Sequence, residues 1–505
     1  MTQFSICIRA AAALTALMIS LSFVSCTEKS ASPVRSHFPS ETDSQLPLPS
    51  DVFIPETQHT NHELPSEPSS VPPDSPKNIR SDSVSSCEPS SDVSSGEELH
   101  RFCGILRSCR PPVLELKGSD GTVVRFPWRT DQIPAVGSRV LVSYTGRINP
   151  ASRMQDVLIQ KIGIQKSSAS LPVRILSAMT EEEKIGQMFL ARFPERNAAQ
   201  EASAFSLGGY VLYARDFEHR TPQQAADMIA ACQKHAAIPL LIAVDEEGGK
   251  VTRISRFPAY RPAPFPAPAD LMAGGQNTVI SDTAEKCRLL NSLGINVNLG
   301  PVCDVARSEK DYIFPRCWST DPLQAAAAVK TIVSEMTRNR TGAVLKHFPG
   351  YGNNLDTHTG TARDSRPYSE FERIDFLPFR AGISQGAGAV MVAHNVVECM
   401  DKTLPASLSP EVLRILRHEF DFHGVIITDG LDMKGILGFS RSENPAVLAV
   451  LAGNDLLCTG DWRVQFPAVA EAVRLGKIPE KQIDQSVLRI LIWKEQLGIL
   501  SETVF

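Results

Sequence analysis

Eight short apolar runs recur between residue 188 and residue 458, separated by longer segments with apolar residues at helical spacing. These segments include 222–236, 281–293, 322–338 and 410–420, and three of them begin with a proline that follows Thr, Asp or Ser, as in a capped helix start. Such alternation over roughly 330 residues predicts an α/β fold, either a (β/α)8 barrel or a doubly wound open sheet. The expected strands are Met188–Arg192, Gly209–Tyr213, Leu240–Val244, Ile295–Leu299, Ala343–Lys346, Val390–Ala393, Val425–Thr428 and Leu456–Cys458.

Polar residues gather where these runs end. In chain order they are Asp245, Asp304, Lys346 with His347, His394 and Asp429, after the third to the seventh run. A (β/α)8 barrel collects its catalytic groups at the carboxyl ends of its strands, whereas a role in stability would scatter them over both ends. The sequence therefore predicts a (β/α)8 barrel with its site at that rim, over residues 171–505.

Residues 98–165 have a different pattern, with short apolar runs at 113–116, 123–126, 140–144 and 157–159 separated by turns. They predict a small β domain of about five strands, similar to an OB-fold. It could bind a sugar or serve as a spacer. Residues 27–97 are rich in Ser and Pro with few large apolar residues, so we expect a disordered linker.

The first 26 residues predict a targeting segment. The apolar run 10–21 is short for a membrane span, and Phe23-Val24-Ser25-Cys26 resembles a bacterial lipobox. That resemblance implies a lipidated Cys26 and a protein of the bacterial cell envelope that touches the membrane through its lipid anchor only. The alternative is an ordinary secretory signal with an incidental cysteine.

Composition narrows the possible partners and cofactors. A net charge of −5 over 505 residues without a long basic run argues against nucleic acid. Of 11 cysteines, Cys7 and Cys26 belong to the signal, so at least one of the remaining nine has no partner within the chain. No CxxC or Cys/His cluster indicates a metal, and no motif indicates an organic cofactor. We expect a monomer.

Five segments in this order resemble the β-N-acetylglucosaminidases (β-hexosaminidases) of glycoside hydrolase family 3. They are 242–253, with Asp-Glu-Glu-Gly-Gly; 295–304, which ends in Gly-Pro-Val-Cys-Asp; 346–352, Lys-His-Phe-Pro-Gly-Tyr-Gly; 390–394, Val-Met-Val-Ala-His; and 424–433, with Thr-Asp-Gly-Leu-Asp-Met. The resemblance covers about residues 171 to 500. One departure is Tyr351, where the family often has histidine in Pro-Gly-His-Gly.

The resemblance implies roles for individual residues. Asp429 would be the nucleophile of a retaining mechanism, and Asp356-Thr357-His358 would supply the acid/base histidine with an aspartate that orients it. Substrate would be bound by Asp245, Arg253, Arg316, Lys346 and His347. Asp304 and His394 could shape the pocket or belong to the core.

The activity implied is removal of terminal β-linked N-acetylglucosamine with retention of configuration, with carbohydrate fragments of peptidoglycan as the expected substrate. A β-glucosidase usually takes a glutamate acid/base from a second domain, and the sequence ends at Phe505, soon after the last expected helix. A family member that uses phosphate in place of water remains an alternative. So does an inactive envelope lipoprotein that binds glycan.

Overall fold

The computed structural model describes residues 100–110, 113–127, 136–148, 157–165, 169–354, 356, 360–439 and 443–502. The expected signal segment with Cys26, the linker 27–97 and His358 lie outside these residues.

Eight parallel strands form a barrel. They are β6 (Phe189–Arg192), β7 (Gly209–Leu212), β8 (Leu241–Val244), β9 (Val297–Asn298), β10 (Gly342–Phe348), β12 (Ala389–Val392), β14 (Val425–Thr428) and β15 (Leu457–Thr459). Their order is β14-β12-β10-β9-β8-β7-β6-β15, and a parallel bridge between Ile427 and Leu456 joins the two ends. The predicted barrel is therefore confirmed over the open sheet, and each expected run overlaps one of the strands.

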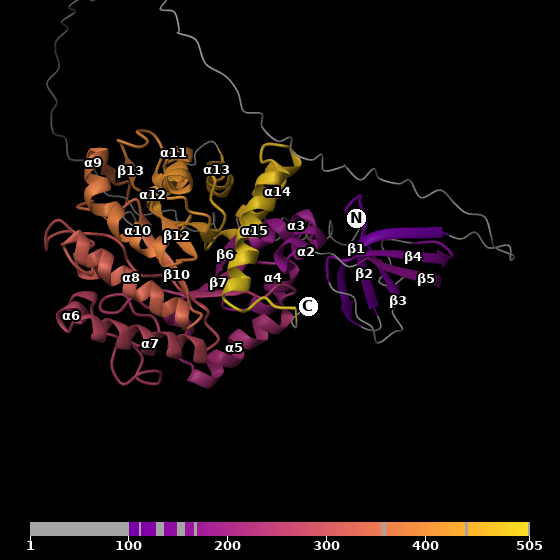
Figure 1. Cartoon of the computed structure of the whole chain (residues 1–505), viewed down its shortest axis with the longest axis horizontal. Helices are drawn as coiled ribbons and strands as arrows, with labels where there is room; N and C mark the ends of the chain where they lie inside the picture. The colour runs from indigo at the N-terminus through magenta and orange to yellow at the C-terminus, as the bar shows by residue number, and fades with distance from the viewer. Residues whose placement is uncertain are drawn as a thin grey trace, which may run out of the picture. The chain divides into compact units, whose positions relative to one another are not determined.

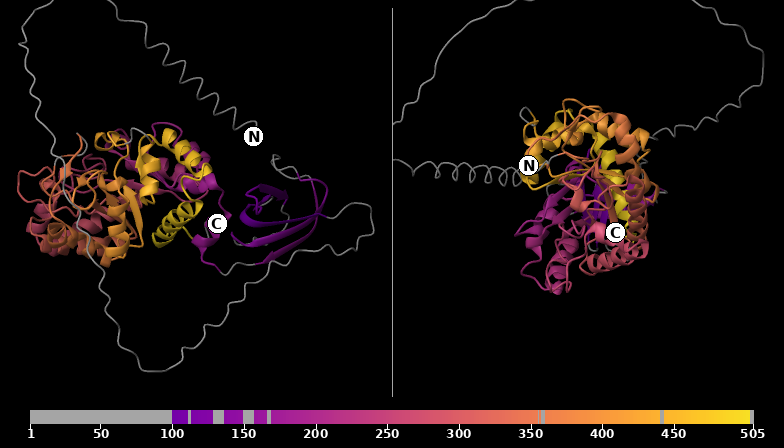
Figure 2. Two further views of the ribbon diagram at one scale, coloured as in Figure 1. Left: turned by 90° about the horizontal axis from the view of Figure 1, so that it is seen from above. Right: turned by 90° about the vertical axis from the view of Figure 1, so that its left-hand side faces the viewer.

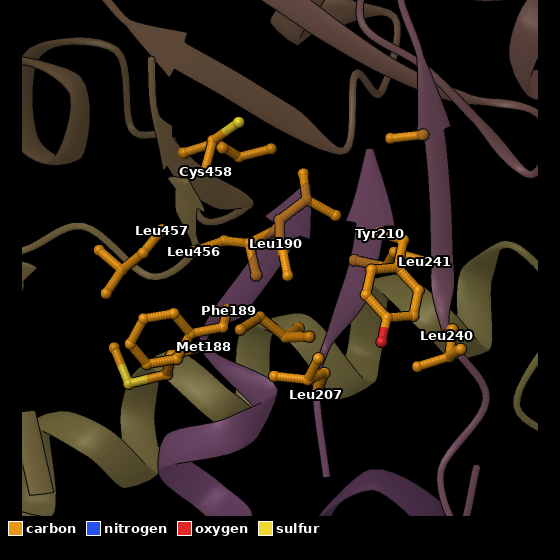
Figure 3. Packing of buried hydrophobic residues seen from close by; sticks show 14 of the residues in the cluster. Met188, Phe189, Leu190, Leu207, Tyr210, Leu240, Leu241, Leu456, Leu457 and Cys458 are labelled. Carbon is orange, nitrogen blue, oxygen red and sulfur yellow. The ribbon is translucent and has the colours of Figure 1, made fainter. Parts of the chain in front are cut away.

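The strand sequences explain this arrangement. β7, β8, β12 and β14 are buried along their whole length, and a strand covered on both faces reads as a continuous apolar run. Figure 3 shows part of the packing, with Phe189 and Leu190 from β6, Tyr210 from β7 and Leu241 from β8 among the buried side chains. Each such side chain contributes about 1.5–3 kcal/mol when fully buried.

Helices surround the strands, and α5, α7, α8 and α10 follow one another around the outside (Figure 1). The helices are α2 (Leu171–Ala178), α3 (Glu181–Gln187), α4 (Ala198–Ala204), α5 (Pro222–His235), α6 (Pro268–Ala273), α7 (Gln276–Ser292), α8 (Pro322–Arg338), α9 (Tyr368–Glu370), α10 (Phe376–Ser384), α11 (Pro410–Arg414), α12 (Lys434–Leu437), α13 (Pro445–Ala452), α14 (Trp462–Arg474) and α15 (Glu480–Gln496). Within the described ranges, none of them is long and apolar enough to cross a membrane.

Two helices differ from expectation. α7 begins at Gln276, before the predicted start at residue 281, because Gly275 turns the chain with a φ of 82° and the polar first turn adds no apolar signal. The predicted helix 410–420 is α11 followed by the π-helical turn η5 (Ile415–Glu419). A second π-helical turn, η3 (Phe371–Asp375), precedes α10.

The described residues between 100 and 165 form a separate five-stranded antiparallel sheet in the order β3-β2-β1-β4-β5, whose curvature is visible in the left view of Figure 2. Its strands are β1 (His100–Arg110), β2 (Val113–Lys117), β3 (Val123–Pro127), β4 (Arg139–Thr145) and β5 (Leu158–Gln165). Four match predicted runs. The central strand β1 had no predicted run because polar residues interrupt its alternation, although Leu106 is fully buried.

Candidate active site

The expected site residues meet at the rim formed by the carboxyl ends of the barrel strands. Asp245 follows the last residue of β8, and Asp429 follows the last residue of β14. Lys346 and His347 lie in the last half of β10. The parallel register brings these ends to the same edge, so residues far apart in the sequence become neighbours.

Lys346 is the centre of a buried group of charges. Its Nζ lies 2.7 Å from Asp245 Oδ1 and 2.7 Å from Glu247 Oε1, and its side chain is 2% exposed. On the other side, Arg316 holds Glu247 with two hydrogen bonds, from Nε at 2.9 Å and from Nη2 at 2.8 Å. Two cations and two carboxylates therefore compensate one another in a largely buried place, where Lys346 and Glu247 are the most deeply buried members.

The pKa values of this group reflect that compensation. Burial alone would raise the pKa of Glu247, but the adjacent Arg316 and Lys346 hold it well below its ordinary value. Burial alone would lower the pKa of Lys346, yet Asp245 and Glu247 raise it. Glu247 and Lys346 therefore both stay charged at neutral pH.

His347 is held by hydrogen bonds at both ring nitrogens. Its Nδ1 lies 2.7 Å from Asp304 Oδ2, and its Nε2 lies 3.1 Å from Arg316 Nη2. An arginine nitrogen can only donate, so Nε2 accepts and the ring proton is on Nδ1, donated to Asp304. Because that single N–H is already used, positioning Arg316 is the role that this geometry favours for His347.

Arg253 approaches the same group from the loop after β8. Its Nη2 lies 3.6 Å from Asp245 Oδ2, and its buried Nε has no hydrogen-bond partner among the described residues. The buried Glu246 fixes this loop by accepting from the backbone N–H groups of Arg253 at 2.9 Å and Ile254 at 2.8 Å. Arg253 thus lies beside Asp245 on a rigid support, with one buried N–H that no described residue accepts.

Asp429 lies on the opposite part of the rim. Its backbone N–H donates to Val392 O at 3.0 Å, and its Oδ1 accepts from Gly430 N at 2.8 Å. Burial raises the pKa of the Cys458 thiol well above its ordinary value, and the carboxylates of Asp429 and Asp245 add to the rise. Both aspartates therefore act on one thiol in β15.

His394 supports the turn that follows Asp429. Its Nε2 lies 2.9 Å from Gly430 O and its Nδ1 lies 2.7 Å from Ser407 Oγ. A carbonyl only accepts, so Nε2 carries the proton and Nδ1 accepts from the serine hydroxyl. Of the two roles left open for His394, the structure favours support of the site from a fully buried position.

Asp356 is brought next to Arg316 through a tyrosine. Burial raises the pKa of the Tyr312 hydroxyl, the charge of Arg316 lowers it and the charge of Asp356 raises it, so both charged groups lie close to this side chain. The Tyr312 ring lies 6.1 Å from that of Tyr351, which in turn meets the His347 ring edge-on at 5.2 Å. Tyr351, which stands where the family often has histidine, is therefore a buried residue that packs between these two rings.

Three residues of this site had no assigned binding or catalytic role from the sequence: Glu247, Asp304 and Tyr312. Glu247 is adjacent to Glu246, and only the fold shows which of the two faces Lys346. Asp304 accepts hydrogen bonds from His347 and from Tyr351 N, the latter at 2.8 Å. Its position after a strand did not indicate either contact. Among the described residues, no group of three or more His, Cys, Asp or Glu side chains could hold a metal ion.

The comparison with protein families decides what kind of barrel this is. The model described as "Glycosyl hydrolase family 3 N terminal domain" matches residues 180–492, which is most of the barrel and more than half of the chain. The chain belongs to glycoside hydrolase family 3. The resemblance predicted from the sequence segments is therefore confirmed.

Other members of family 3 agree with this assignment. A β-hexosaminidase of Stenotrophomonas maltophilia is 37% identical over 234 residues, covering 45% of this chain and 68% of that protein. β-Hexosaminidase A of Pseudoalteromonas piscicida is 29% identical over 58% of this chain, and the match covers 54% of that longer relative. A family 3 β-N-acetylglucosaminidase structure from Paenibacillus has 30% identity and a TM-score of 0.59, with 64% of this chain and 63% of that chain covered.

Proposed function

We propose that this family 3 chain is a retaining exo-β-N-acetylglucosaminidase. The observation that carries the proposal is that Asp429 and the Asp245–Lys346 pair occupy one rim of the barrel. Relatives named β-hexosaminidase support the substrate class. Asp429 would be the nucleophile, and His358, oriented by Asp356, would be the acid/base.

The reaction would proceed in two displacements. The Asp429 carboxylate attacks the anomeric carbon while His358 gives a proton to the departing glycosidic oxygen, so a glycosyl-enzyme forms and the leaving alcohol departs neutral. His358 then takes a proton from water, whose oxygen attacks the same carbon and releases Asp429. Two inversions give net retention.

Binding would use the charges already described. Lys346 has three N–H donors, of which two point at Asp245 and Glu247, so the third is available to a sugar hydroxyl. Asp245 can accept from a hydroxyl and is held in place by Lys346 and Arg253. Such preorganised groups lose little freedom when substrate binds.

The decisive experiment compares an aryl N-acetyl-β-glucosaminide with an aryl β-glucoside on the purified protein. We expect turnover of the first, and preference for the second would indicate the β-glucosidase alternative. Asp429→Ala should abolish turnover, whereas Asp270→Ala, which removes an exposed carboxylate in α6, should leave it unchanged. No turnover of either substrate by the wild-type protein would favour the inactive glycan-binding alternative.

Product analysis separates water from phosphate as the acceptor. With phosphate present, hydrolysis gives free N-acetylglucosamine, and phosphorolysis gives its 1-phosphate. We propose water as the acceptor, so the sugar phosphate should be missing from the products.

We also propose that the protein works in the bacterial cell envelope on peptidoglycan fragments, held by lipid on Cys26. The Ser/Pro-rich segment 27–97 would separate the anchor from the barrel. Cys26→Ser should move the protein from the membrane fraction to the soluble fraction without changing kcat/KM on a small substrate. Wild-type protein without lipid would contradict the anchor.

A further inference from the structure

The loop that carries Asp356 leaves the barrel at the end of β10 and returns as a short strand. That strand, β11 (Arg363–Asp364), pairs in parallel with β13 (Val396–Val397), which follows β12. The departing end is held by Tyr351 N, which donates to Asp304 Oδ1 at 2.8 Å. The returning end is held by Val396 N, which donates to Ala362 O at 2.9 Å.

Arg366 joins the two ends of this loop. Its Nη2 donates to Gly350 O at 3.3 Å, where the loop departs, and to Asp364 Oδ2 at 2.7 Å, where it returns. Asn354 adds a second link across the loop, since its Nδ2 donates to Asp364 Oδ2 at 2.6 Å. The loop is therefore closed at its base by side chains as well as by the strand.

Two glycines at the base of the loop meet backbone and space requirements that other residues would not. Gly350 has a φ of 125°, and a Cβ added there would lie 2.5 Å from Asp375 Oδ1. Gly352 has a φ of 53°, and its Cβ would lie 2.5 Å from the Arg366 guanidinium carbon. Both positions need positive φ and also need the space that a side chain would fill.

The group behind Arg366 is buried and charge-balanced. Arg366 Nη1 donates to Asp375 Oδ2 at 2.8 Å, and Arg307 Nη2 donates to the same oxygen at 2.7 Å. Burial raises the pKa of Asp375 to about 6 in spite of these two arginines, so at neutral pH it is ionised and paired. The Arg366 guanidinium also stacks 4.2 Å above the Phe371 ring. These contacts leave Arg366 little freedom.

We propose that Arg366 is a positioning residue for the reaction, which fixes the base of the loop together with Asp364 and Asn354 and thereby sets the place of Asp356. The inference rests on the proposed function, in which Asp356 orients the acid/base histidine. A planar arginine fork suits this role because it spans three acceptors at once. A loop tip that drifts by about 1 Å costs up to about 10²-fold in rate, which is the scale of effect expected here.

The test is Arg366→Lys, which keeps the positive charge and removes the fork. Acid assistance matters for a sugar leaving group and hardly for nitrophenolate. We therefore expect kcat/KM to fall by about 10- to 100-fold on a β-linked N-acetylglucosamine disaccharide and by only about threefold on the nitrophenyl substrate. In an Asp356→Asn background the additional loss on the disaccharide should disappear, because the same function is already removed.

Two further variants separate positioning from stability. Arg307→Lys removes an arginine from the same Asp375 oxygen without touching the loop, so it should lower the melting temperature without any difference between the substrates. Asn354→Ala removes one hydrogen bond of a half-buried side chain, so the variant should fold. Its kcat/KM should also fall more on the disaccharide than on the nitrophenyl substrate, by a smaller factor than in Arg366→Lys.

Equal losses on both substrates in Arg366→Lys and Asn354→Ala would overturn the proposal, as would a substrate difference that persists in the Asp356→Asn background. The proposed function fails on other observations, namely an inactive wild-type chain or an Asp356→Asn variant that treats both substrates alike.

Discussion

Arg316 holds both carboxylate oxygens of Glu247 through two hydrogen bonds, of 2.9 Å from Nε and 2.8 Å from Nη2. Glu247→Gln should break this pair and leave Arg316 and Lys346 as neighbouring buried cations. Removing one partner of a buried pair typically costs about 3–5 kcal/mol of the free energy of unfolding, because the other charge stays uncompensated. Urea unfolding measures that loss, and kcat/KM should fall by about 10-fold or more as Lys346 loses a fixed partner.

The control for Glu247→Gln is Glu201→Gln. Glu201 also accepts hydrogen bonds from Nε and Nη2 of an arginine, but the side chain of that arginine, Arg463, is 51% exposed, so water replaces the lost partner. Its loss of stability should stay within about 1 kcal/mol. Equal losses of stability in both variants would show that breaking the Arg316–Glu247 pair leaves no uncompensated buried charge.

Tyr312→Phe should separate the hydroxyl of Tyr312 from its ring. The ring contact with Tyr351 stays, and the hydroxyl that interacts with Asp356 and Arg316 is lost. A polar interaction of this kind is worth about 0.5–1.5 kcal/mol, so we expect kcat/KM to fall by about 2- to 10-fold at nearly unchanged melting temperature. Tyr368→Phe, whose hydroxyl donates to Glu419 on the turn after α11, should leave kcat/KM unchanged. Wild-type kinetics in Tyr312→Phe would contradict a role for the hydroxyl.

His394→Phe should affect the nucleophile side of the site. The variant keeps a ring but loses the donor to Gly430 O, beside Asp429. A displaced Asp429 slows formation of the glycosyl-enzyme whatever the leaving group, so kcat/KM should fall by a similar factor on disaccharide and nitrophenyl substrates. Ser407→Ala, which removes only the partner of Nδ1, should cause a smaller loss. A loss in His394→Phe confined to the disaccharide would contradict this assignment.

The barrel was predictable from sequence because its strands are buried on both faces. A run such as Val390–Ala393 is apolar throughout and needs no alternation to be recognised. β1 of the small sheet was not predictable in the same way, since Arg101 and Cys103 are exposed between half-buried and buried neighbours. Its central place in the sheet depends on pairing with β2 on one side and with β4 on the other, and no local sequence pattern indicates these pairings.

The site was predictable to the extent that local motifs carry it. Asp245, Lys346 and Asp429 follow from their places at strand ends, and the structure brings these ends together. The contact of Tyr312 with Asp356 joins two loops, and no local pattern indicates it. Likewise, no local pattern indicates that Asp364 and Arg366 support the loop of Asp356, because that role depends on the two ends of the loop lying next to each other.

Lys494 lies far from any motif and is fully buried in α15. Its Nζ donates to Gln187 Oε1 at 2.7 Å, while Gln187 Nε2 donates to Ser206 O at 2.6 Å. Burial without an opposite charge lowers the pKa of Lys494 to about 7. In the unfolded chain the same group has a pKa of about 10.4.

Lys494→Met should therefore change how stability depends on pH. Between about pH 7 and 10.4 the unfolded wild-type chain binds a proton that the folded chain does not, so wild-type stability rises with pH, at up to about 1.4 kcal/mol per unit. Below about pH 7 both states are protonated and the full cost remains. The variant lacks this dependence, so its stability relative to wild type should be greatest near pH 7 and decline towards pH 10. Loss of the donor to Gln187 subtracts about 1–3 kcal/mol at every pH.

Urea unfolding at four pH values across this range gives the difference in stability between variant and wild type, in which other titrating groups cancel. Lys477→Met, which removes a half-exposed lysine paired with Glu443, should give a flat difference. A flat difference for Lys494→Met as well would mean that Lys494 is charged in the folded protein.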